Sequence, residues 1–218
     1  MRAIVTCGPS YEPIDEVRRL TNFSTGELGS LLAAALSSAG IRTLCLRGEG
    51  ATYPAPESPT ETRSFSTNEN LARQLAECSD GGEFHAIFHA AALCDYRPAS
   101  IFDAAGADVS GPKIPTRAGA LTIRLEPAAK VLPELRKWFP RASIIGWKYE
   151  LAGTAEQALA AARDQMVANH TDACVLNGRA AGAGFQLVRP DRSQECFATK
   201  EALCDGLVQS LCGGLLSR

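Results

Sequence analysis

The sequence has no apolar stretch long enough to cross a bilayer, and it has no excess of positive charge. Its 218 residues include 22 Lys and Arg against 24 Asp and Glu, a formal net charge of −2. A chain with this balance offers no basic face to nucleic acid and no electrostatic attraction to an anionic membrane surface. Met1 leads directly into the first apolar run, which leaves no room for a signal peptide. We therefore expect a cytoplasmic protein that binds neither nucleic acids nor membranes.

The spacings of metal and disulfide sites are also missing. Of the 8 cysteines no two form a C-x-x-C motif, and no cysteine–histidine cluster has the spacing of a zinc site. Most cysteines stand in apolar runs, so we expect small buried side chains in a reducing compartment. His85 and His89 share the run FHAIFHAAAL, which is typical of a strand. We expect them to pack in the core or at the sheet edge, and we expect no metal site built from protein side chains.

The most informative segment that the chain does contain is Asn22–Gly29, which reads NFSTGELG. It stands between Ala3–Cys7, a predicted buried strand, and Ser30–Ser38, a predicted helix. Glycine lets the backbone approach an anion closely, and the first free N–H groups and the positive dipole end of a helix attract one. The pattern indicates a phosphate site, although a tight turn without a ligand has the same composition.

Apolar runs and helical patterns alternate along the chain, which predicts an α/β fold. We expect a Rossmann-like, doubly wound, mostly parallel sheet flanked by helices, in one domain over residues 1–218. The predicted parallel strands are Arg2–Cys7, Arg42–Leu46, His85–Ala92, Ser143–Trp147 and Ala173–Leu176. The predicted helices are Ser30–Ser38 with Gly40 as its cap, one opened by a Ser66–Glu69 capping box, Pro127–Phe139, one opened by Thr154 and Gln157, and one capped by Thr199.

Some segments fall outside this alternation. Tyr11–Thr21 is predicted to be a polar connection, and Gly48–Thr62 a surface loop. Residues 99–119, rich in Ala, Gly, Asp, Ser and Pro, predict a mobile flap with a single lysine, Lys113. An antiparallel extension is expected from the alternating run Ala120–Leu125 and from a hairpin that joins Phe185–Val188 to Glu195–Ala198.

Four blocks of the sequence resemble the phosphopantothenoylcysteine synthetase (phosphopantothenate–cysteine ligase) family. They read VTCGPSYEPIDEVRRLTNFSTGELG, HAAALCDYRP, KIPTRAGALTIRLEPAAKVL and IIGWKYEL. The resemblance runs from Arg2 to about Phe197, and its most specific part is the order EPID, VR, TN and S-[ST]-G-x-x-G. Many bacterial members also carry a flavin-dependent decarboxylase domain that this chain lacks, so we expect no FMN and no decarboxylation.

The resemblance implies a ligase of coenzyme A biosynthesis. A nucleoside triphosphate with Mg²⁺ would activate the carboxylate of 4′-phosphopantothenate as an acyl-nucleotide, and the amine of L-cysteine would then displace the nucleotide. The implied nucleotide-binding residues are Gly8, Ser24, Gly26, Gly29, Lys113, Trp147 and Asn177. The implied phosphopantothenate-binding residues are Asn22, Ala91, Ala92, Asp95 and Arg18. In bacterial members the residue at Asp95 binds the nucleotide instead, so its role is divided between the two ligands. Arg18 would come from the neighbouring subunit of a homodimer. Asn22, which would stabilise the acyl intermediate, and Lys113 are the expected catalytic residues. Arg18 has no obvious partner in its own loop.

The chain departs from the family pattern in its lysines. Bacterial members carry KIKK where this sequence has Lys113–Thr116, and they carry two further lysines where Gln165 and Asn169 stand here, to within a turn. The segment WKYE resembles the F-K-L-E of eukaryotic, ATP-using members, and its Lys148 would replace the missing charge. CTP and ATP both remain open as the nucleotide.

Other readings of these residues compete with the ligase. Gly29 also suits close helix–sheet packing, Trp147 a core position and Lys113 a solvated surface charge. The lost lysines are compatible with a non-catalytic paralogue that binds a nucleotide or a pantetheine-like ligand. An NAD(P) oxidoreductase is a weaker alternative, because no G-x-G-x-x-G follows the first strand and Arg47, not an acidic residue, ends the second.

Overall fold

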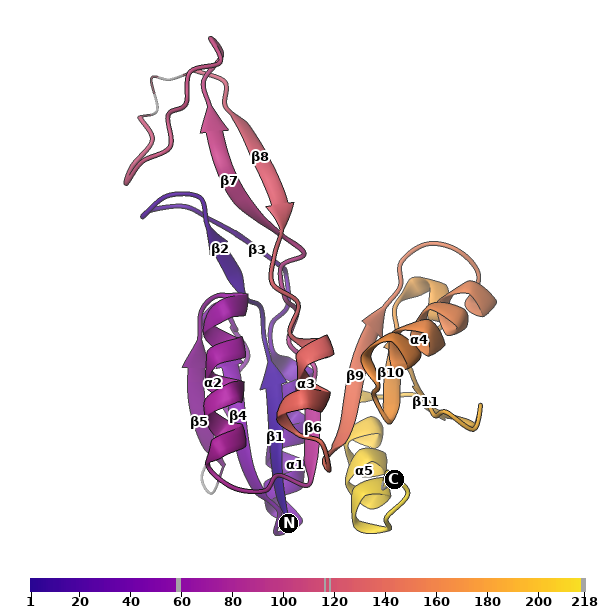
Figure 1. Ribbon diagram of the computed structural model, residues 1–218. Helices are drawn as coiled ribbons and strands as arrows, with labels where there is room; N and C mark the ends of the chain where they lie inside the picture. The colour runs from indigo at the N-terminus through magenta and orange to yellow at the C-terminus, as the bar shows by residue number, and fades with distance from the viewer. Residues whose placement is uncertain (58–59, 116, 118, 217–218) are drawn as a thin grey trace.

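The computed structural model describes residues 1–57, 60–115, 117 and 119–216. Within these ranges the largest unit is an eight-stranded sheet in the order β12-β11-β10-β9-β6-β1-β4-β5 (Figure 1). Its parallel strands are β1 (Arg2–Cys7), β4 (Arg42–Gly48), β5 (Glu61–Phe65), β6 (Ala86–His89), β9 (Ser143–Tyr149) and β10 (Ala173–Asn177). β11 (Phe185–Val188) and β12 (Gln194–Phe197) continue the sheet as the predicted antiparallel hairpin. The doubly wound prediction is confirmed, and the chain order reverses between β1 and β6.

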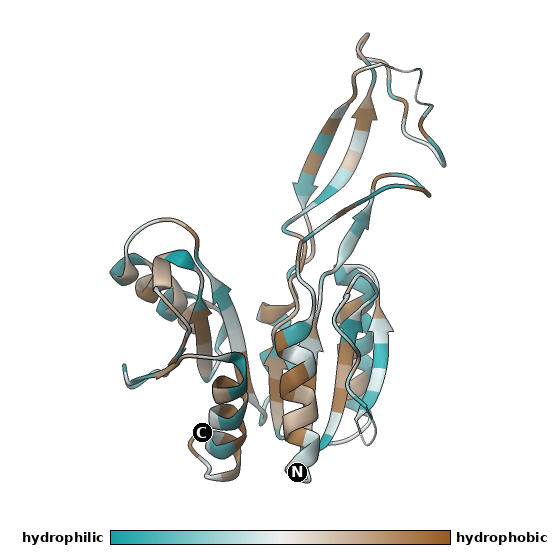
Figure 2. Cartoon of the chain, turned by 180° about the vertical axis from the view of Figure 1, so that it is seen from behind, coloured by the Kyte–Doolittle hydropathy of each residue, from teal (hydrophilic) through white to brown (hydrophobic). Residues whose placement is uncertain are grey.

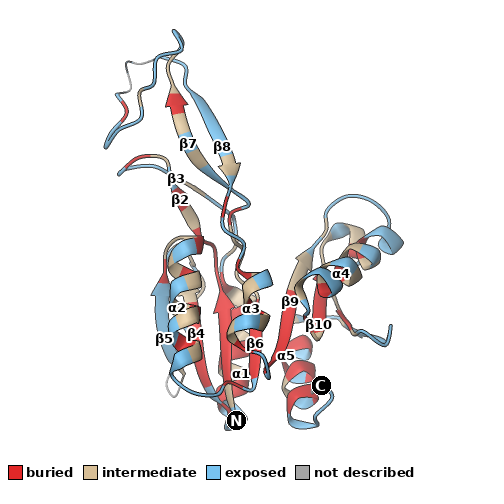
Figure 3. Ribbon diagram, viewed as in Figure 1, coloured by how far each residue is buried: buried red, intermediate tan, exposed pale blue. Residues whose placement is uncertain are grey.

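Helices cover both faces of the sheet. One face carries α1 (Glu27–Ser38) and α5 (Lys200–Cys212); the other carries α2 (Asn68–Asp80), α3 (Leu132–Trp138) and α4 (Ala155–Asn169). In β1 the side chains of Ala3, Val5 and Cys7 join the α1/α5 core, whereas Ile4 joins the α2/α3 core. This alternation explains the uninterrupted apolar run of β1, since both of its faces are buried (Figure 3).

Two antiparallel hairpins project beyond the carboxyl ends of the parallel strands (Figure 1). The shorter consists of β2 (Tyr11–Pro13) and β3 (Arg19–Thr21), and the longer, which we call the arm, of β7 (Tyr96–Phe102) and β8 (Thr122–Pro127). Their tips are joined, because the Glu16 N–H donates to the carbonyl of Pro112 at 2.9 Å. Tyr11–Thr21 is therefore a hairpin rather than an irregular connection, and the predicted flap starts inside β7. Residues 116 and 118 of that flap lie outside the described residues.

Several predicted boundaries shift. α1 begins at Glu27, so Gly29 lies in its first turn, and Gly40 follows its cap with φ +78°. The expected Ser66–Glu69 capping box is wrong: Thr67 caps α2, and its hydroxyl accepts the Asn70 N–H at 3.1 Å. The capping box of α4 at Thr154 is confirmed. The helix predicted to start at Pro127 starts later, because β8 continues to that proline. A short 3-10 turn, η2 (Arg179–Ala181), follows β10.

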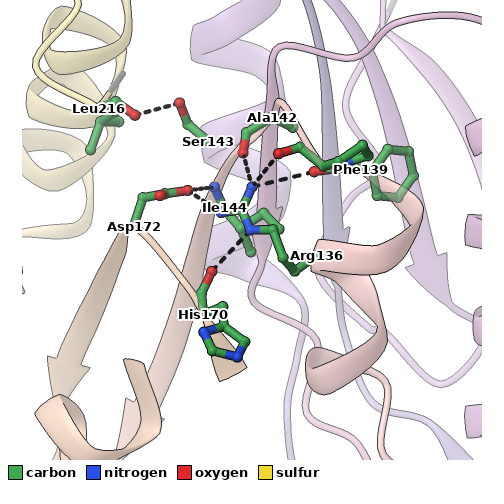
Figure 4. Close-up of polar contacts among 9 residues, drawn as sticks. Arg136, Phe139, Ala142, Ser143, Ile144, His170, Asp172 and Leu216 are labelled. Carbon is green, nitrogen blue, oxygen red and sulfur yellow. Dashed lines mark hydrogen bonds and ion pairs between the residues drawn. The ribbon is translucent and has the colours of Figure 1, made fainter. Parts of the chain in front are cut away.

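An arginine at the amino ends of the strands ties several elements together (Figure 4). The guanidinium of Arg136 pairs with Asp172 at 2.6 Å and donates to the carbonyls of Ala142 at 2.8 Å and His170 at 3.1 Å. Asp172 in turn accepts the N–H of Ile144 at 2.7 Å. Both charged side chains are largely buried, so α3, α4, β9 and the start of β10 are held together at this one place.

Six of the eight cysteines are buried, as expected; Cys196 and Cys212 are exposed. In the part of the chain that the structure describes, no helix combines the length and apolar character that a membrane span needs.

Candidate active site

The switch point of the sheet brings three of the predicted residues together. The Ala92 N–H donates to the carbonyl of Gly8 at 2.9 Å, so the loops after β1 and β6 run side by side. The side-chain amide of Asn22 donates to the carbonyl of Ala92 at 3.0 Å. In doubly wound folds a ligand binds at this crevice beyond the strand ends. Asn22, Gly8 and Ala92 therefore meet where a substrate is expected.

The segment Asn22–Gly29 forms an open helix start. Gly26, with φ +79°, is the residue before α1, and the first helical hydrogen bond runs from the Ser30 N–H to the carbonyl of Gly26 at 3.0 Å. The hydroxyls of Ser24 and Thr25 accept the N–H groups of Gly26 and Glu27 at 3.4 and 3.3 Å. The N–H groups of Leu28 and Gly29 precede the helical ladder and point out of its end. Such a terminus is suited to an anion.

The glycines here are required by close approach. A Cβ on Gly8 or on Gly26 would stand 2.8 or 2.9 Å from the Cβ of Ala51, and both glycines have positive φ. A Cβ on Gly29 would overlap the side chain of Cys7 and stand 3.3 Å from its Cα. Gly8 and Gly26 thus shape the loop, whereas Gly29 lets α1 pack directly on β1.

A cavity of about 440 Å³ opens between this helix start and the end of β10; we call it the glycine-loop cavity. It is lined by Gly8, Phe23, Ser24, Thr25, Gly26, Glu27, Leu28, Gly29, Ala90, Tyr149, Asn177, Phe185 and Lys200. Five of the predicted nucleotide-binding residues are among them. Sequence reasoning missed Glu27 and Lys200, which form an ion pair across this cavity. No local pattern connects two residues 173 positions apart.

A second cavity of about 430 Å³ opens on the other face of the sheet; we call it the Asp95 cavity. It is lined by His89, Ala91, Leu93, Cys94, Asp95, Ala129, Lys130, Val131, Leu132, Pro133, Trp147, Gln165 and Asn169. The carboxylate of Asp95 pairs with the ammonium of Lys130, a residue that sequence reasoning also missed. Ala90 lines one cavity and Ala91 the other, so the end of β6 lies between the two cavities.

The other candidate residues on β9 and β6, which are Trp147, Lys148 and His89, lie on different faces of the sheet. Trp147 packs its side chain against the α1/α5 core, and its carbonyl accepts an amide hydrogen from Gln165 at 3.2 Å. Lys148 pairs with Glu150 at 3.1 Å and is not among the described residues that line either cavity. His89 is buried at the Asp95 cavity, with its Nδ1 2.8 Å from the hydroxyl of Thr6. Burial lowers the pKa of His89 to about 4, so this imidazole is neutral at pH 7.

Arg18 and Lys113 lie away from both cavities, at the joined hairpin tips. The expectation that Arg18 lacks a local partner is wrong: its guanidinium pairs with Asp15 at 2.7 Å and donates to the carbonyl of Ile114. Asp15 also accepts the N–H groups of Val17, Arg18 and Ile114 at 2.8, 2.7 and 3.2 Å. Burial of Asp15 opposes ionisation, but these donors and the Arg18 charge outweigh it and lower the pKa of the carboxyl. Lys113 stands between Pro112 and Ile114, which both bond to this shorter hairpin.

Comparison with known proteins identifies the family. The model of the DNA/pantothenate metabolism flavoprotein C-terminal domain matches residues 1–200. The chain belongs to this family. The match covers the sheet from β1 to β12 and the start of α5.

Relatives of this flavoprotein C-terminal domain include enzymes of coenzyme A biosynthesis. The bifunctional protein CoaBC of Bacillus subtilis (strain 168) is 27% identical over 183 residues, which are 84% of this chain and 41% of CoaBC. The CoaBC of Thermococcus kodakarensis is 25% identical over 177 residues, 81% of this chain and 41% of that protein. The chain thus spans less than half the length of the curated relatives it matches.

Solved structures share the architecture of this domain. A DNA/pantothenate metabolism flavoprotein from Streptococcus pneumoniae superposes with a TM-score of 0.85 at 23% identity, over 98% of this chain and 99% of that one. At this identity the match shows the fold, and it includes the sheet with flanking helices described above.

Proposed function

We propose that this chain joins 4′-phosphopantothenate to L-cysteine through an acyl-nucleotide, as a phosphopantothenate–cysteine ligase of coenzyme A biosynthesis. The observation that carries the proposal is the meeting of Asn22 and Ala92 at the switch point, with a cavity on each side of the end of β6. A ligase that joins two substrates needs room for both of them near one point. The relatives named CoaBC support the proposal through their printed role in coenzyme A biosynthesis.

In this proposal the nucleotide, CTP or ATP, occupies the glycine-loop cavity. Gly8, Ser24, Gly26 and Gly29 supply backbone and hydroxyl donors to its phosphates, and Asn177 closes the cavity at the end of β10. Attack of a carboxylate on a phosphate brings two anions together, so rigid donors and positive charge lower the barrier. Lys200 supplies one such charge from α5.

Mg²⁺ is proposed to arrive with the nucleotide. The described residues contain no group of three or more His, Cys, Asp and Glu side chains that could hold a metal ion by themselves. Mg²⁺ commonly takes one or two carboxylates and completes its shell with water and substrate phosphates. Glu27 in one cavity and Asp95 in the other are single carboxylates that fit this mode. The ion would supply charge that offsets the phosphates.

Asn22 is proposed to hold the activated carbonyl during the second half-reaction. Its amide nitrogen already lies 3.0 Å from the Ala92 carbonyl, which fixes the side chain beside the strand end. An amide donor placed in this way stabilises the oxyanion that forms when an amine attacks an acyl group. Ala91, Ala92 and Asp95 would border the phosphopantothenate chain on the adjoining side.

A homodimer is proposed because the arm exposes an apolar face. Ile123 and Leu125 alternate with polar residues in β8, Leu121 directly precedes that strand, and the three are 37%, 44% and 39% exposed. Apolar and polar residues alternate along the arm in Figure 2, and among the described residues these apolar side chains stay exposed. A second copy supplies a matching surface through two-fold symmetry. It would also bring the hairpin tip with Arg18 and Lys113 to the neighbouring site.

A second candidate is a non-catalytic protein that binds a nucleotide or pantetheine-like ligand, favoured by the neutral Gln165 and Asn169 in the Asp95 cavity. For either function we propose a cytoplasmic location and small-molecule partners, since the buried thiols suit a reducing compartment.

The experiment that tests the proposal is pyrophosphate release. Protein is mixed with Mg²⁺, phosphopantothenate and either CTP or ATP, and pyrophosphate is measured before and after cysteine is added. The ligase predicts phosphopantothenate-dependent pyrophosphate release with one nucleotide and phosphopantothenoylcysteine as the product. Ligand binding by calorimetry without pyrophosphate release would replace the ligase with the binding protein.

A further inference from the structure

We propose that Lys130 is the phosphate-binding cation of the Asp95 cavity, and that it positions the phosphate of one substrate there. The inference rests on the proposed ligase for the identity of that substrate. Its basis is the charge distribution among the described residues that line the cavity: Lys130 carries the single positive charge, and Asp95 the single negative one. His89, the other basic side chain, is neutral at pH 7.

The α4 wall of the cavity offers neutral amides, Gln165 and Asn169, and no positive charge. The side-chain nitrogen of Asn169 donates to the carbonyl of Gln165 at 2.7 Å. The side-chain nitrogen of Gln165 donates to the carbonyl of Trp147 at 3.2 Å and contacts the sulfur of Cys174. These hydrogen bonds engage both donors of Gln165 and one of the two donors of Asn169, and neither side chain carries a charge. A phosphate therefore finds its positive partner on the opposite wall, at Lys130.

The opposite wall is built to hold that lysine. Asn68 is 1% exposed, and its amide nitrogen donates to the carbonyl of Cys94 at 2.8 Å and to that of Ala129 at 2.9 Å. These two residues directly precede Asp95 and Lys130. The Ala128 N–H adds a bond to the Asp95 carbonyl at 2.9 Å. One buried amide thus fixes the backbone of both charged residues relative to each other.

The ion pair between Lys130 and Asp95 can be replaced by a pair between Lys130 and a phosphate. The side chains of Lys130 and Asp95 are 58% and 73% exposed, and a pair so accessible to water contributes little to stability. A phosphate carries more negative charge than a carboxylate and accepts hydrogen bonds on several oxygens. Lys130 can therefore move from Asp95 to an arriving phosphate while its backbone stays fixed. With the nucleotide in the glycine-loop cavity, as proposed above, that phosphate belongs to phosphopantothenate. A nucleotide bound in the Asp95 cavity instead would supply it from its own phosphates.

The test compares Lys130→Gln and Lys130→Arg with the matched control Lys137→Gln. Lys137 lies on α3, is exposed and pairs with Glu134, and it does not line this cavity. Binding of inorganic pyrophosphate to the full chain is measured by calorimetry. We expect Lys130→Gln to weaken it about tenfold, Lys130→Arg to retain most of it, and Lys137→Gln to leave it unchanged. Because Lys130→Gln also leaves Asp95 unpaired, the comparison is repeated in an Asp95→Asn background, where the same loss is expected.

Steady-state kinetics identify the source of the phosphate. If it is the nucleotide, Lys130→Gln raises KM for the nucleotide; if it is phosphopantothenate, KM for that substrate rises instead. Pyrophosphate binding that is absent, or equal in wild type and Lys130→Gln, overturns the inference, as do two unchanged KM values. A wild-type chain that binds pyrophosphate through Lys130 but releases none from a nucleotide would refute the ligase and leave the inference standing.

Discussion

Gly29 of α1 lies directly against Cys7 of β1, with no room between them for a side chain. A Cβ on Gly29 would stand 3.3 Å from the Cα and 3.5 Å from the sulfur of Cys7 and would overlap the Cys7 Cβ. Both residues are buried, and the first turn of α1 at the glycine-loop cavity rests on this contact. The shape of the glycine-loop cavity and the packing of α1 on β1 thus both depend on the absence of a side chain at Gly29.

Gly29→Ala is expected to destabilise the fold by about 1–3 kcal/mol, because the extra carbon must push α1 away from β1. Urea denaturation gives the free energy of unfolding. Gly111→Ala is the control, since a Cβ on Gly111 meets no atom within 4 Å. Equal stability of Gly29→Ala and wild type would mean that α1 can shift freely.

Asn22→Ala is expected to spare pyrophosphate release and to slow amide formation by ~10²–10³, the usual cost of losing one oxyanion donor. Its hydrogen bond to Ala92 fixes the side chain at the strand end. The two half-reactions are followed separately, as pyrophosphate and as phosphopantothenoylcysteine. Product formation at the wild-type rate would remove Asn22 from the second step.

Lys113→Gln is expected to slow nucleotide-dependent activation, because in the proposed dimer it removes a cation from the neighbouring site. The backbone on both sides of Lys113 is bonded to the shorter hairpin. The rate of pyrophosphate release at saturating phosphopantothenate reports the effect. Unchanged kinetics would make Lys113 a solvated surface charge.

Arg18→Ala and Asp95→Ala are each expected to be nearly inactive, yet to complement each other when co-expressed. If Arg18 serves the neighbouring subunit, half of the randomly mixed dimers are heterodimers with one intact site, so about a quarter of wild-type activity returns. Tagged subunits establish that mixed dimers form. Because Arg18 pairs with Asp15 in its own chain, Arg18→Ala must also be shown to keep its stability. Mixed dimers without activity would place Arg18 outside the neighbouring site.

The stability of the protein is expected to fall as the pH drops from 6.5 towards 4, because His89 cannot easily take up a proton while buried. In the unfolded chain the same imidazole titrates near 6.5, so acid favours unfolding in this window, by up to about 3 kcal/mol. His89→Gln can keep a hydrogen bond with Thr6 and should show a weaker pH dependence. Parallel curves for the two proteins would assign the acid sensitivity to other groups.

Apolar runs in the sequence correctly predicted the strands that are buried on both faces of the sheet. β1 is one such strand, apolar throughout its middle. β5 was missed because only Phe65 in it is buried, so no apolar run marks it. The β2–β3 hairpin was missed because its three-residue strands carry no apolar alternation, although Asp15 closes the turn by accepting the N–H groups of Val17 and Arg18.

Some residues of the candidate site could be predicted from local sequence, and others could not. The glycine loop was predictable because backbone geometry demands glycine at fixed spacing, as the φ of Gly26 shows. Lys130 and Lys200 were not, because each reaches its cavity only through tertiary structure, 35 and 173 positions from the carboxylate it pairs with. The ion-pair partner of Arg18, Asp15, is only three residues away in the sequence. It was missed because a segment predicted to be a polar connection gave no reason to expect a buried carboxylate there.

The Arg136–Asp172 anchor lies at the end of the strands opposite to both cavities. It joins α3, α4, β9 and β10 through residues that line neither the glycine-loop cavity nor the Asp95 cavity. This anchor is therefore separate from the side chains that would contact a ligand in either cavity. Lysines and amides around the two cavities can change during evolution, and ligand preference with them, while the anchor stays the same.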